Sequence, residues 1–572
     1  MACSWVSKKD APDSAVMSTS GFGASEFPWR FLAEGKMHAC YQYAPQTSSQ
    51  TSDAPPATFG TNTTDPHRNK ILRVAKSDIV RGAIAANRSS STSDDEECKE
   101  FSLIVPATAR SSCHPNLRYI LEVVRPLLGP QYVDVPQRAI IRAGFAAKLW
   151  RVAIDSGKIA HYRFASWDLD DGENNENNKN NNRIEATVLF DHTKISIPAL
   201  FMNCSEGTCL SVEIKPKAGY ISCSPLIDPR RRIKLAQTKY WIHQQLMAKG
   251  RLKKGWGSLR NDDKYESVAS SYSPLDLFSL EKIRIQHALR CLFEHPQNNL
   301  RVWYDGKILI GHSTEELGDS QAMSILQRVF PHMTASGTIC FQDAIVETVS
   351  AILMKEPLLS RLHIGQLDFI DTDGAILIWK HLVQLCNGDL NKAEKLVDQY
   401  QGNIQSIDDV VMDDTNTNRA DGVGLKTLRD RIVSFREEME IIRNDKKGLP
   451  DAKWLDEAYT ETSELIGHLN KEESVQVLAA WLLSLSMCDL SFFVTLRPAL
   501  TPTTTTSGLS TETSSNMQTE DSLGCLTVSQ GGGAPPFINY FYSIKVVDCD
   551  MKPSRKLRNR EEAETVMDGL KY

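Results

Sequence analysis

Short apolar runs of strand length alternate along this chain with longer segments of helical period. The strand-type runs are Ile71–Val74, Ala186–Phe190, Leu210–Ile214, Leu300–Tyr304 and Lys307–Gly311. In the segments 234–249, 280–293 and 474–484 apolar residues recur at three-to-four spacing, which predicts helices. No repeat of about 20 to 50 residues recurs, which argues against a solenoid or a propeller. The pattern therefore predicts a fold of mixed α and β structure.

The size and charge of the chain limit the classes of protein to which it can belong. Its 572 residues suffice for about two to four domains, and 41% hydrophobic with 24% charged residues is typical of a folded, soluble protein. A net charge of -6 gives no long-range attraction to nucleic acid or to an anionic membrane. We therefore expect neither as a partner, and any polyanion site must be a local cluster of cations.

Two further patterns bear on the compartment. No run of about 18 apolar residues occurs, and residues 1–21 lack the apolar core of a signal peptide. The 13 cysteines are scattered, and the closest pair, Cys204 and Cys209, is too widely spaced for a C-x2-C metal knuckle. We expect reduced thiols and a location in the cytoplasm, the nucleus or both.

Several polar stretches cannot bury enough apolar surface to offset their ordering entropy. They are residues 1–26, 45–66, 88–99, the Asn- and Glu-rich 172–182, and the Thr- and Ser-rich 501–535. We expect a disordered N-terminus at 1–26 and low-complexity insertions at the others, with 501–535 disordered.

A lysine motif follows the apolar run Leu210–Val212. It reads Glu213-Ile-Lys215-Pro-Lys217 and continues into Ala-Gly-Tyr. In an extended strand the side chains of Glu213, Lys215 and Lys217 would share one face. Two ammonium groups on that face could bind phosphates as point charges. The alternative is a solvated edge strand whose lysines only discourage aggregation.

Three more motifs are unusually specific. Tyr272–Phe278 reads Y-S-P-L-D-L-F, and Leu485–Ser491 reads L-S-M-C-D-L-S before an apolar strand that runs to Arg497. Asn298–Gly311 reads N-N-L-R-V-W-Y-D-G-K-I-L-I-G, which predicts a hairpin with Asp-Gly at its tip.

An acidic motif lies near the C-terminus, where Val546–Pro553 reads V-V-D-C-D-M-K-P. In a strand, Asp548, Asp550 and Lys552 would alternate onto one face. Two carboxylates beside a lysine suit Mg²⁺ that bridges nucleotide phosphates. Taken singly, an aspartate near a strand end is more often a turn or cap residue.

These five strings, in the order in which they occur along the chain, resemble the inositol-pentakisphosphate 2-kinase family over about residues 27–570, outside the insertions. The resemblance implies an α+β fold of the distant protein-kinase-like inositol polyphosphate kinase type, with two lobes and an enlarged C-lobe. The N-lobe would span 27–189 and the C-lobe, with the inositol phosphate pocket, 190–572.

The resemblance also implies the reaction. It is transfer of the γ-phosphate of ATP to the 2-hydroxyl of inositol 1,3,4,5,6-pentakisphosphate, with Mg²⁺, to give inositol hexakisphosphate. The substrate would be soluble and the protein a monomer. Two alternatives stay open: a non-catalytic inositol-phosphate-binding scaffold, and an inositol polyphosphate kinase of other positional specificity.

Matching positions carry the family's roles onto this chain. Asp489 would be the catalytic aspartate, with Lys215 also in a catalytic role, and Asp548 would hold Mg²⁺ with Asp550. The residues expected to bind ATP are Gly35, Lys36, Met37, His38, Arg73, Phe190, Asp191, His192 and Glu213. The residues expected to bind the inositol phosphate are Arg163, Lys215, Lys217, Lys249, Asn298, Asn299, Arg301, Lys552, Arg555 and Lys556.

The chain departs from the family pattern in its cation and glycine positions. The expected glycine-rich loop keeps only Gly35, so side-chain donors of the following residues would replace backbone amides. Cys488 and Met247 stand where the family usually has lysine. Lys249 is expected to compensate for the second of these.

Two other segments, 371–386 and 230–234, could be taken for a zinc site and for a binding patch. Plant members of the family carry a zinc site built from histidines and cysteines, but the corresponding stretch 371–386 offers His381 and a single cysteine. We therefore expect no zinc. The basic run 230–234 is expected to be a solvated helix start, with a nuclear-localisation or phosphoinositide-binding patch as the alternative.

Overall fold

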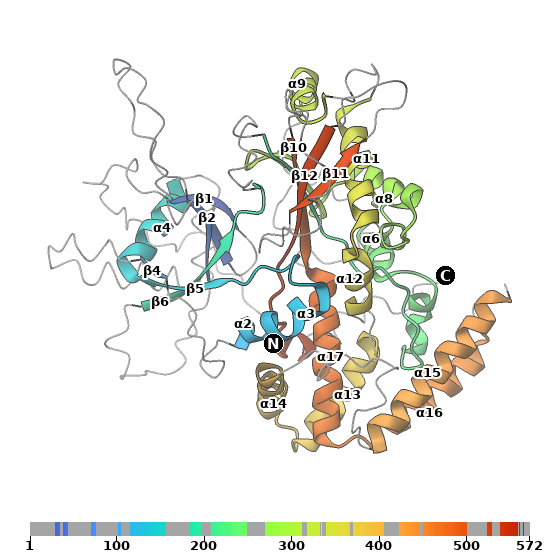
Figure 1. The fold of residues 1–572 in the computed structure, drawn as a ribbon. Helices are drawn as coiled ribbons and strands as arrows, with labels where there is room; N and C mark the ends of the chain where they lie inside the picture. Colours follow the sequence, from blue (N-terminus) through green and yellow to red (C-terminus); the bar gives the residue numbers. More distant parts are fainter. Residues whose placement is uncertain are drawn as a thin grey trace, which may run out of the picture. The chain divides into compact units, whose positions relative to one another are not determined.

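The computed structural model describes residues 29–34, 38–43, 70–75, 101–103, 115–155, 183–195, 208–248, 269–311, 317–331, 333, 339–366, 370–404, 423–445, 450–499, 523–528, 538–558, 560 and 564. The chain (Figure 1) divides into two compact units. The first comprises Met1–Val105 and Gln137–Phe190, and the second comprises Pro106–Pro136 and Asp191–Tyr572. The second unit thus takes in 106–136, which lies inside the range expected for the N-lobe.

The first unit is built on a six-stranded antiparallel sheet. Its spatial order is β1 (Trp29–Glu34), β2 (His38–Tyr43), β3 (Lys70–Ala75), β6 (Arg183–Phe190), β5 (Gln137–Arg142) and β4 (Phe101–Leu103). Helix α4 (Ala143–Asp155) contacts β1, β5 and β6. Phe145 and Leu149 of α4 are buried, as are Leu72 and Val74 of β3. The strands predicted at 71–74 and 186–190 are confirmed.

A second antiparallel sheet organises the second unit. Its spatial order is β11 (Gly524–Val528), β12 (Ile538–Val547), β10 (Ser491–Ala499), β7 (Leu210–Ile214), β8 (Leu300–Tyr304) and β9 (Lys307–Ile310). The strands predicted at 210–214, 300–304 and 307–311 are confirmed, the last to within one residue. Asp305 and Gly306 join β8 to β9 with φ angles of 48° and 78°, as the predicted Asp-Gly hairpin requires.

The rest of the second unit, in its described ranges, contains the following helices. In chain order they are α2 (Pro115–Tyr119), the π-helix η3 (Ile120–Val124), α3 (Arg125–Leu128), the 3-10 helix η6 (Pro229–Leu235), α6 (Lys239–Ala248), α7 (Pro274–Leu277), α8 (Lys282–Glu294), α9 (Asp319–Val329), α11 (Phe341–Lys355), α12 (Leu358–Gln366), α13 (Thr372–Leu385), α14 (Leu390–Asn403), α15 (Val423–Asn444), α16 (Ala452–Ile466), α17 (Lys471–Asp489) and α18 (Arg555–Arg558). Among the helices of the described ranges we find no candidate for a membrane span.

Two of the three predicted helices are confirmed and the third begins late. The segment 474–484 lies within α17, and the segment 280–293 corresponds to α8, which begins two residues later, at Lys282. The segment 234–249 becomes helical only at Lys239, because the Thr238 hydroxyl accepts the Trp241 N–H (3.1 Å) and caps a new helix there. Lys234 and Leu235 belong to η6, and residues 236–238 separate it from α6.

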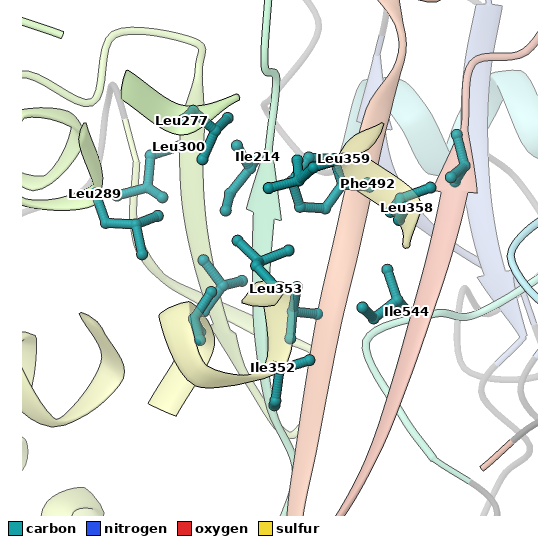
Figure 2. Packing of buried hydrophobic residues seen from close by; sticks show 14 of the residues in the cluster. Ile214, Leu277, Leu289, Leu300, Ile352, Leu353, Leu358, Leu359, Phe492 and Ile544 are labelled. Atoms are coloured by element: carbon teal, nitrogen blue, oxygen red, sulfur yellow. The ribbon is translucent and has the colours of Figure 1, made fainter. Parts of the chain in front are cut away.

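Side chains from α8, α11 and α12 pack against the second sheet and form its main core (Figure 2). Leu289, Ile352 and Leu359 lie in one cluster with Ile214 of β7 and Phe492 of β10, and each is at most 1% exposed. Burial of a side chain of this size is worth about 1.5–3 kcal/mol. The strands that carry the lysine motif and the motif of Asp489 are therefore firmly held.

Strand β11 lies within 501–535, so the prediction of a disordered insertion is wrong at Gly524–Val528. The strand pairs with β12 from Gly524↔Tyr542 to Val528↔Ile538. A Cβ atom on Gly524 would come within 2.2 Å of the Tyr542 ring, so the glycine permits this close approach. Pairing with the edge of β12 supplies hydrogen bonds that composition alone does not reveal.

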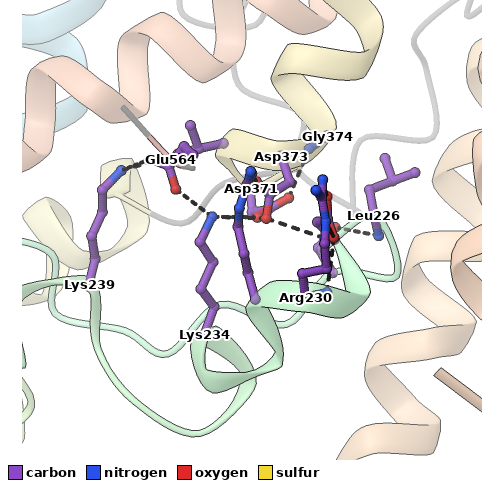
Figure 3. Close-up of polar contacts among 12 residues, drawn as sticks. Leu226, Arg230, Lys234, Lys239, Asp371, Asp373, Gly374 and Glu564 are labelled. Atoms are coloured by element: carbon purple, nitrogen blue, oxygen red, sulfur yellow. Dashed lines mark hydrogen bonds and ion pairs between the residues drawn. The ribbon is translucent and has the colours of Figure 1, made fainter. Parts of the chain in front are cut away.

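A buried cluster of charges joins η6 to the start of α13 and to Glu564 (Figure 3). Lys234 Nζ lies 2.6 Å from Glu564 Oε2 and 2.9 Å from Asp373 Oδ2. Arg231 also pairs with Asp373, and all four side chains are at most 7% exposed. Arg231 and Lys234 are therefore neither solvated nor available to a nuclear-import or phosphoinositide partner, so both predictions for the basic run 230–234 are wrong at these two residues. Both side chains are buried and paired with carboxylates that are distant in sequence.

Asp371, the N-cap of α13, completes this ionic cluster. Its Oδ1 accepts the Gly374 N–H (3.0 Å), whereas its Oδ2 lies 3.8 Å from Lys234 Nζ. Burial first, and repulsion by Asp373 second, raise the pKa of Asp371 from 3.8 to about 6. Because the folded-state pKa is raised, this group's contribution to stability is full below about pH 4 and is lost as pH rises through about 6.

We therefore expect Asp371→Asn, which is neutral at every pH and can still cap α13, to gain stability relative to the parent as pH rises. The gain should develop between about pH 4 and about pH 7. Urea unfolding midpoints of both proteins at the two pH values measure it. A difference in midpoint that does not change with pH contradicts the assignment.

Candidate active site

The register of the second sheet brings four of the predicted motifs to one end of it. Ile214, the last residue of β7, pairs with Leu300 at the start of β8 and with Phe492 at the start of β10. Ser491, the first residue of β10, pairs with Val547, the last of β12. The chain therefore leaves β7 and β12 at the same edge where it enters β8 and β10. The segments next to these strand ends are Lys215–Lys217, Asn298–Asn299, Asp489 and Asp548–Lys552.

The lysine motif forms a turn, so the prediction that its three charged residues share one strand face is wrong. β7 ends at Ile214, and although Lys215 still donates its N–H to the Asn299 carbonyl (2.9 Å), Pro216 has no N–H to continue the ladder. Lys217 has a φ of 62°, in the left-handed region. The chain thus bends sharply and presents Lys217 from a turn.

The Tyr272–Phe278 motif supports this turn through two contacts. The Tyr272 hydroxyl donates to the Pro216 carbonyl (2.8 Å) in a buried hydrogen bond. The Phe278 ring lies against Gly219 so closely that a Cβ atom there would come within 2.0 Å of it. A residue larger than glycine would displace the ring or the turn.

Helix α17 delivers Asp489 to the same place. A capping box fixes its start, because the Asn470 side chain accepts the Glu473 N–H (3.0 Å) and the Glu473 carboxylate accepts the Asn470 N–H (2.8 Å). Leu482 and Met487 are fully buried along the helix. Asp489 is the last helical residue before β10.

The Asp489 carboxylate lies near the ammonium groups of Lys552 and Lys217. Its Oδ2 is 3.4 Å from Lys552 Nζ, and its side chain is 48% exposed. Burial raises the pKa of Asp489, but the charges of Lys552 and Lys217 outweigh burial and hold the pKa below its ordinary value. Burial also lowers the pKa of Lys217, an effect that the Asp489 charge opposes. Asp489 is therefore ionised near neutral pH and can accept a hydrogen bond from a hydroxyl group.

The segment after β12 is a bend, so the prediction that Asp548, Asp550 and Lys552 alternate along a strand is wrong. β12 ends at Val547, and Asp548 has a φ of 61°, which a strand cannot include. The Asp548 side chain is exposed, whereas Asp550 Oδ1 accepts a hydrogen bond from the Asn116 amide (2.8 Å). Two carboxylates still lie two positions apart.

Asn116 of α2 holds this acidic bend through both of its amide atoms. Its Nδ2 donates to Asp550, and its Oδ1 accepts the Met551 N–H (2.8 Å). The Ser486 hydroxyl adds a hydrogen bond to the Asp550 carbonyl (3.3 Å). No sequence signal identifies Asn116, because it lies 434 positions from Asp550 and belongs to none of the motifs.

The cations predicted to bind the substrate near the C-terminus come directly after the acidic bend in the sequence. Lys552 faces Asp489, and Arg555 and Lys556 are exposed at the start of α18. Ser554 anchors the segment between them, because its N–H donates to Asp398 Oδ1 (2.9 Å). The three cations thus lie on one short, anchored stretch.

Glu213 and Arg301 bind each other in this structure. Arg301 Nη1 lies 3.1 Å from each carboxylate oxygen of Glu213, across the paired strands β8 and β7. Asn298 is exposed, whereas Asn299 is 2% exposed and its amide donates to the Tyr240 hydroxyl (3.0 Å). The phosphate contacts of Arg301 and the asparagines stay predictions.

His243 of α6 also belongs to this neighbourhood. Burial lowers its pKa, and the charges of Lys217 and Lys239 lower it further. The sequence does contain a signal for His243. The family pattern places a phosphate-binding lysine at position 247, and His243, four positions earlier, shares one face of α6 with that position.

The predicted hinge residues flank the division between the units. Phe190 closes β6, is 44% exposed, and has the Lys70 ammonium 3.4 Å from its ring centroid. Asp191 is buried and accepts the N–H (3.1 Å) and the hydroxyl (2.5 Å) of Thr193. Burial lowers the pKa of His192 to about 4, so the ring is neutral at physiological pH. Their contact with adenine stays a prediction.

The other predicted nucleotide residues belong to the first unit. His38 begins β2 opposite Ala75, and Arg73 lies half-buried in β3 beside Cys40. β1 and β2 pair as an antiparallel hairpin around the expected glycine loop. The predicted site residues that lie outside the described ranges are Gly35, Lys36, Met37, Arg163 and Lys249.

Comparisons with known proteins agree on one family. The family model described as "Inositol-pentakisphosphate 2-kinase" matches residues 31–566. An Arabidopsis thaliana protein named inositol-pentakisphosphate 2-kinase is 29% identical over 275 residues, which cover 46% of this chain and 53% of the relative. A protein of Oryza sativa subsp. indica with that activity in its name is 27% identical over 315 residues, 55% of this chain and 63% of the relative. A Danio rerio protein of the same name is 30% identical over 127 residues, 22% of this chain and 23% of the relative. In each case the match spans less than two thirds of the relative's length.

Proposed function

The chain belongs to the inositol-pentakisphosphate 2-kinase family, and we propose that it transfers the γ-phosphate of ATP to the 2-hydroxyl of inositol 1,3,4,5,6-pentakisphosphate. One observation carries this proposal. An ionised carboxylate, Asp489, meets the cations Lys217 and Lys552 at the end of the sheet where the acidic bend also begins. A phosphoryl-transfer site needs these groups together: an acceptor-orienting acid, cations for phosphate and carboxylates for a metal.

Asp489 would orient the acceptor hydroxyl and take up its proton as the new bond to phosphorus forms. Its lowered pKa keeps it ionised, so its main contribution is to align the hydroxyl rather than to act as a strong base. Lys217 and Lys215, delivered by the turn after β7, would neutralise charge on the transferred group.

The acceptor carries a phosphate on every ring position but one, so the site must offer many cations. Lys552, Arg555 and Lys556 lie on one anchored stretch, which supports a role in gripping several phosphates at once. Arg301, whose guanidinium now contacts Glu213, could turn one edge of its donor fork toward a phosphate. Fixing the ring through several such contacts would single out the 2-hydroxyl.

Mg²⁺ is the metal that we infer for the reaction. Carboxylate oxygens are the hard ligands that Mg²⁺ prefers, and Asp548 presents an exposed carboxylate beside Asp550. Asn116 holds Asp550 through a hydrogen bond, which would keep a ligand oriented. When bound there, Mg²⁺ would screen the negative charge of the donor phosphates.

We further propose a two-lobed, distantly protein-kinase-like arrangement in which the first unit supplies most of the nucleotide site. The hairpin of β1 and β2, with Arg73 on the next strand, supports this assignment. The Phe190–His192 segment would then act as the hinge that meets adenine.

A turnover assay tests the proposal. Purified protein with ATP, Mg²⁺ and inositol pentakisphosphate should form inositol hexakisphosphate and ADP in equal amounts. Tight binding of the acceptor with no ADP and no product would instead support the non-catalytic scaffold.

A further inference from the structure

Gln366, the last residue of α12, bridges the lysine turn and the end of α17. Its side-chain nitrogen donates to the Lys217 carbonyl (2.8 Å) and to the Met487 carbonyl (3.2 Å). Its side-chain oxygen accepts the Gly219 N–H (2.8 Å). The residue is fully buried, and all three hydrogen bonds go to backbone atoms.

Only one orientation of this amide satisfies its surroundings. Two carbonyl oxygens face the nitrogen and one N–H faces the oxygen, so a flipped amide would oppose like groups at all three contacts. The backbone of Gln366 is fixed as well, because the Ser484 hydroxyl donates to its carbonyl (2.7 Å). The bridge is therefore rigid at both ends.

The two segments that Gln366 joins are those that carry the proposed chemistry. Lys217 stands in the left-handed region, where a non-glycine residue must be held by its surroundings. Met487 lies two residues before Asp489 in the last turn of α17. We propose that Gln366 is a positioning residue, which sets the place of the Lys217 ammonium relative to the Asp489 carboxylate. This inference rests on the proposed function.

Some of the charged groups around Lys217 and Asp489 lie on segments that Gln366 contacts, and others do not. Lys217 is faced by Asp489, Lys215, Cys488 and Lys552, and Asp489 is faced by Lys552, Lys217 and Arg560. Lys552 and Arg560 come from the C-terminal segment, which Gln366 does not touch in the described contacts. Loss of the bridge should therefore weaken the Lys217 contribution and leave the Lys552 contribution in place.

Gln366→Met keeps the length of the side chain and removes its three hydrogen bonds. We expect kcat per acceptor-binding site to fall by about 10- to 100-fold, because a shift of about 1 Å in a reacting group can cost this much. KM for each substrate should change less than about threefold. The acid limb of the kcat–pH profile should move upward, because Asp489 loses part of the charge that lowers its pKa.

Gln401→Met is the matched control, since Gln401 of α14 is also a buried glutamine (2% exposed) but makes no described hydrogen bond to the lysine turn or to α17. It should leave kcat within about twofold and the acid limb unmoved. If Gln366→Met does not fold, Gln366→Asn keeps the neutral amide but shortens the side chain by one methylene, so that it cannot reach both segments, and the same fall in kcat is expected.

The outcomes separate the two claims. Kinetics of a Gln366 variant that match the Gln401 control overturn the positioning role and leave the proposed function standing. A parent protein that binds the acceptor but forms no product overturns both.

Discussion

Asp489→Asn is expected to lower kcat by about three orders of magnitude while acceptor binding becomes no weaker. Asparagine keeps the shape of the side chain and removes the charge that aligns the acceptor hydroxyl and receives its proton. The acceptor is a polyanion, so removal of a carboxylate that is 48% exposed beside Lys552 takes away a repulsion rather than an attraction. Steady-state kinetics and calorimetric titration of the acceptor measure the two effects separately.

Asp343→Asn is the matched control for this substitution. Asp343 is 51% exposed and pairs with Arg290 at 3.3 Å, so it resembles Asp489 in exposure and in having a cation partner. It lies at the start of α11, and its replacement should leave kcat within about twofold. An Asp489→Asn protein that keeps more than about a tenth of the parent kcat would refute the assigned role.

Lys234→Met is expected to cost about 3–5 kcal/mol of the free energy of unfolding, because it strands buried carboxylates without their main cation. Glu564 and Asp373 lie 2.6 and 2.9 Å from this ammonium and are almost fully buried. Methionine fills the same volume, so lost packing is a small part of the effect. Urea unfolding at pH 7 measures the loss as a shift in midpoint.

Lys239→Met provides the comparison, because Lys239 also faces Glu564, at 3.5 Å, but is 44% exposed. Its loss should cost about 1 kcal/mol or less. Equal destabilisation by the two substitutions would contradict the claim that the buried position of the Lys234 ion pairs causes the loss of stability.

The same ion pair predicts a dependence on pH. Although burial acts the other way, the attraction of Lys234 lowers the pKa of Glu564 from 4.5 to about 2. Its contribution to stability is therefore present above about pH 4.5 and is lost as pH falls toward about 2.

Local structure was largely predictable from this sequence. The strands 210–214 and 300–304 and the Asp305-Gly306 hairpin depend on residue types within a few positions of one another, and all are confirmed. The segment 501–535 shows the limit of composition, since its end forms β11 only because β12 offers an edge to pair with.

The geometry of the candidate site was much less predictable. Resemblance named Lys217, Asp489 and Asp548, but not the left-handed backbone of Lys217 and Asp548, which tertiary contacts enforce. Asn116 and Gln366 act on segments far away in the chain and belong to no motif. The burial of Arg231 and Lys234 likewise depends on distant carboxylates.

The position of the new phosphate tests the central claim most directly. The purified protein would be incubated with ATP, Mg²⁺ and inositol 1,3,4,5,6-pentakisphosphate, and the product examined by proton and phosphorus NMR. We predict inositol hexakisphosphate, with the proton on carbon 2 coupled to a new phosphorus. A product with a diphosphate group and a free 2-hydroxyl, or an unchanged acceptor, would contradict the account.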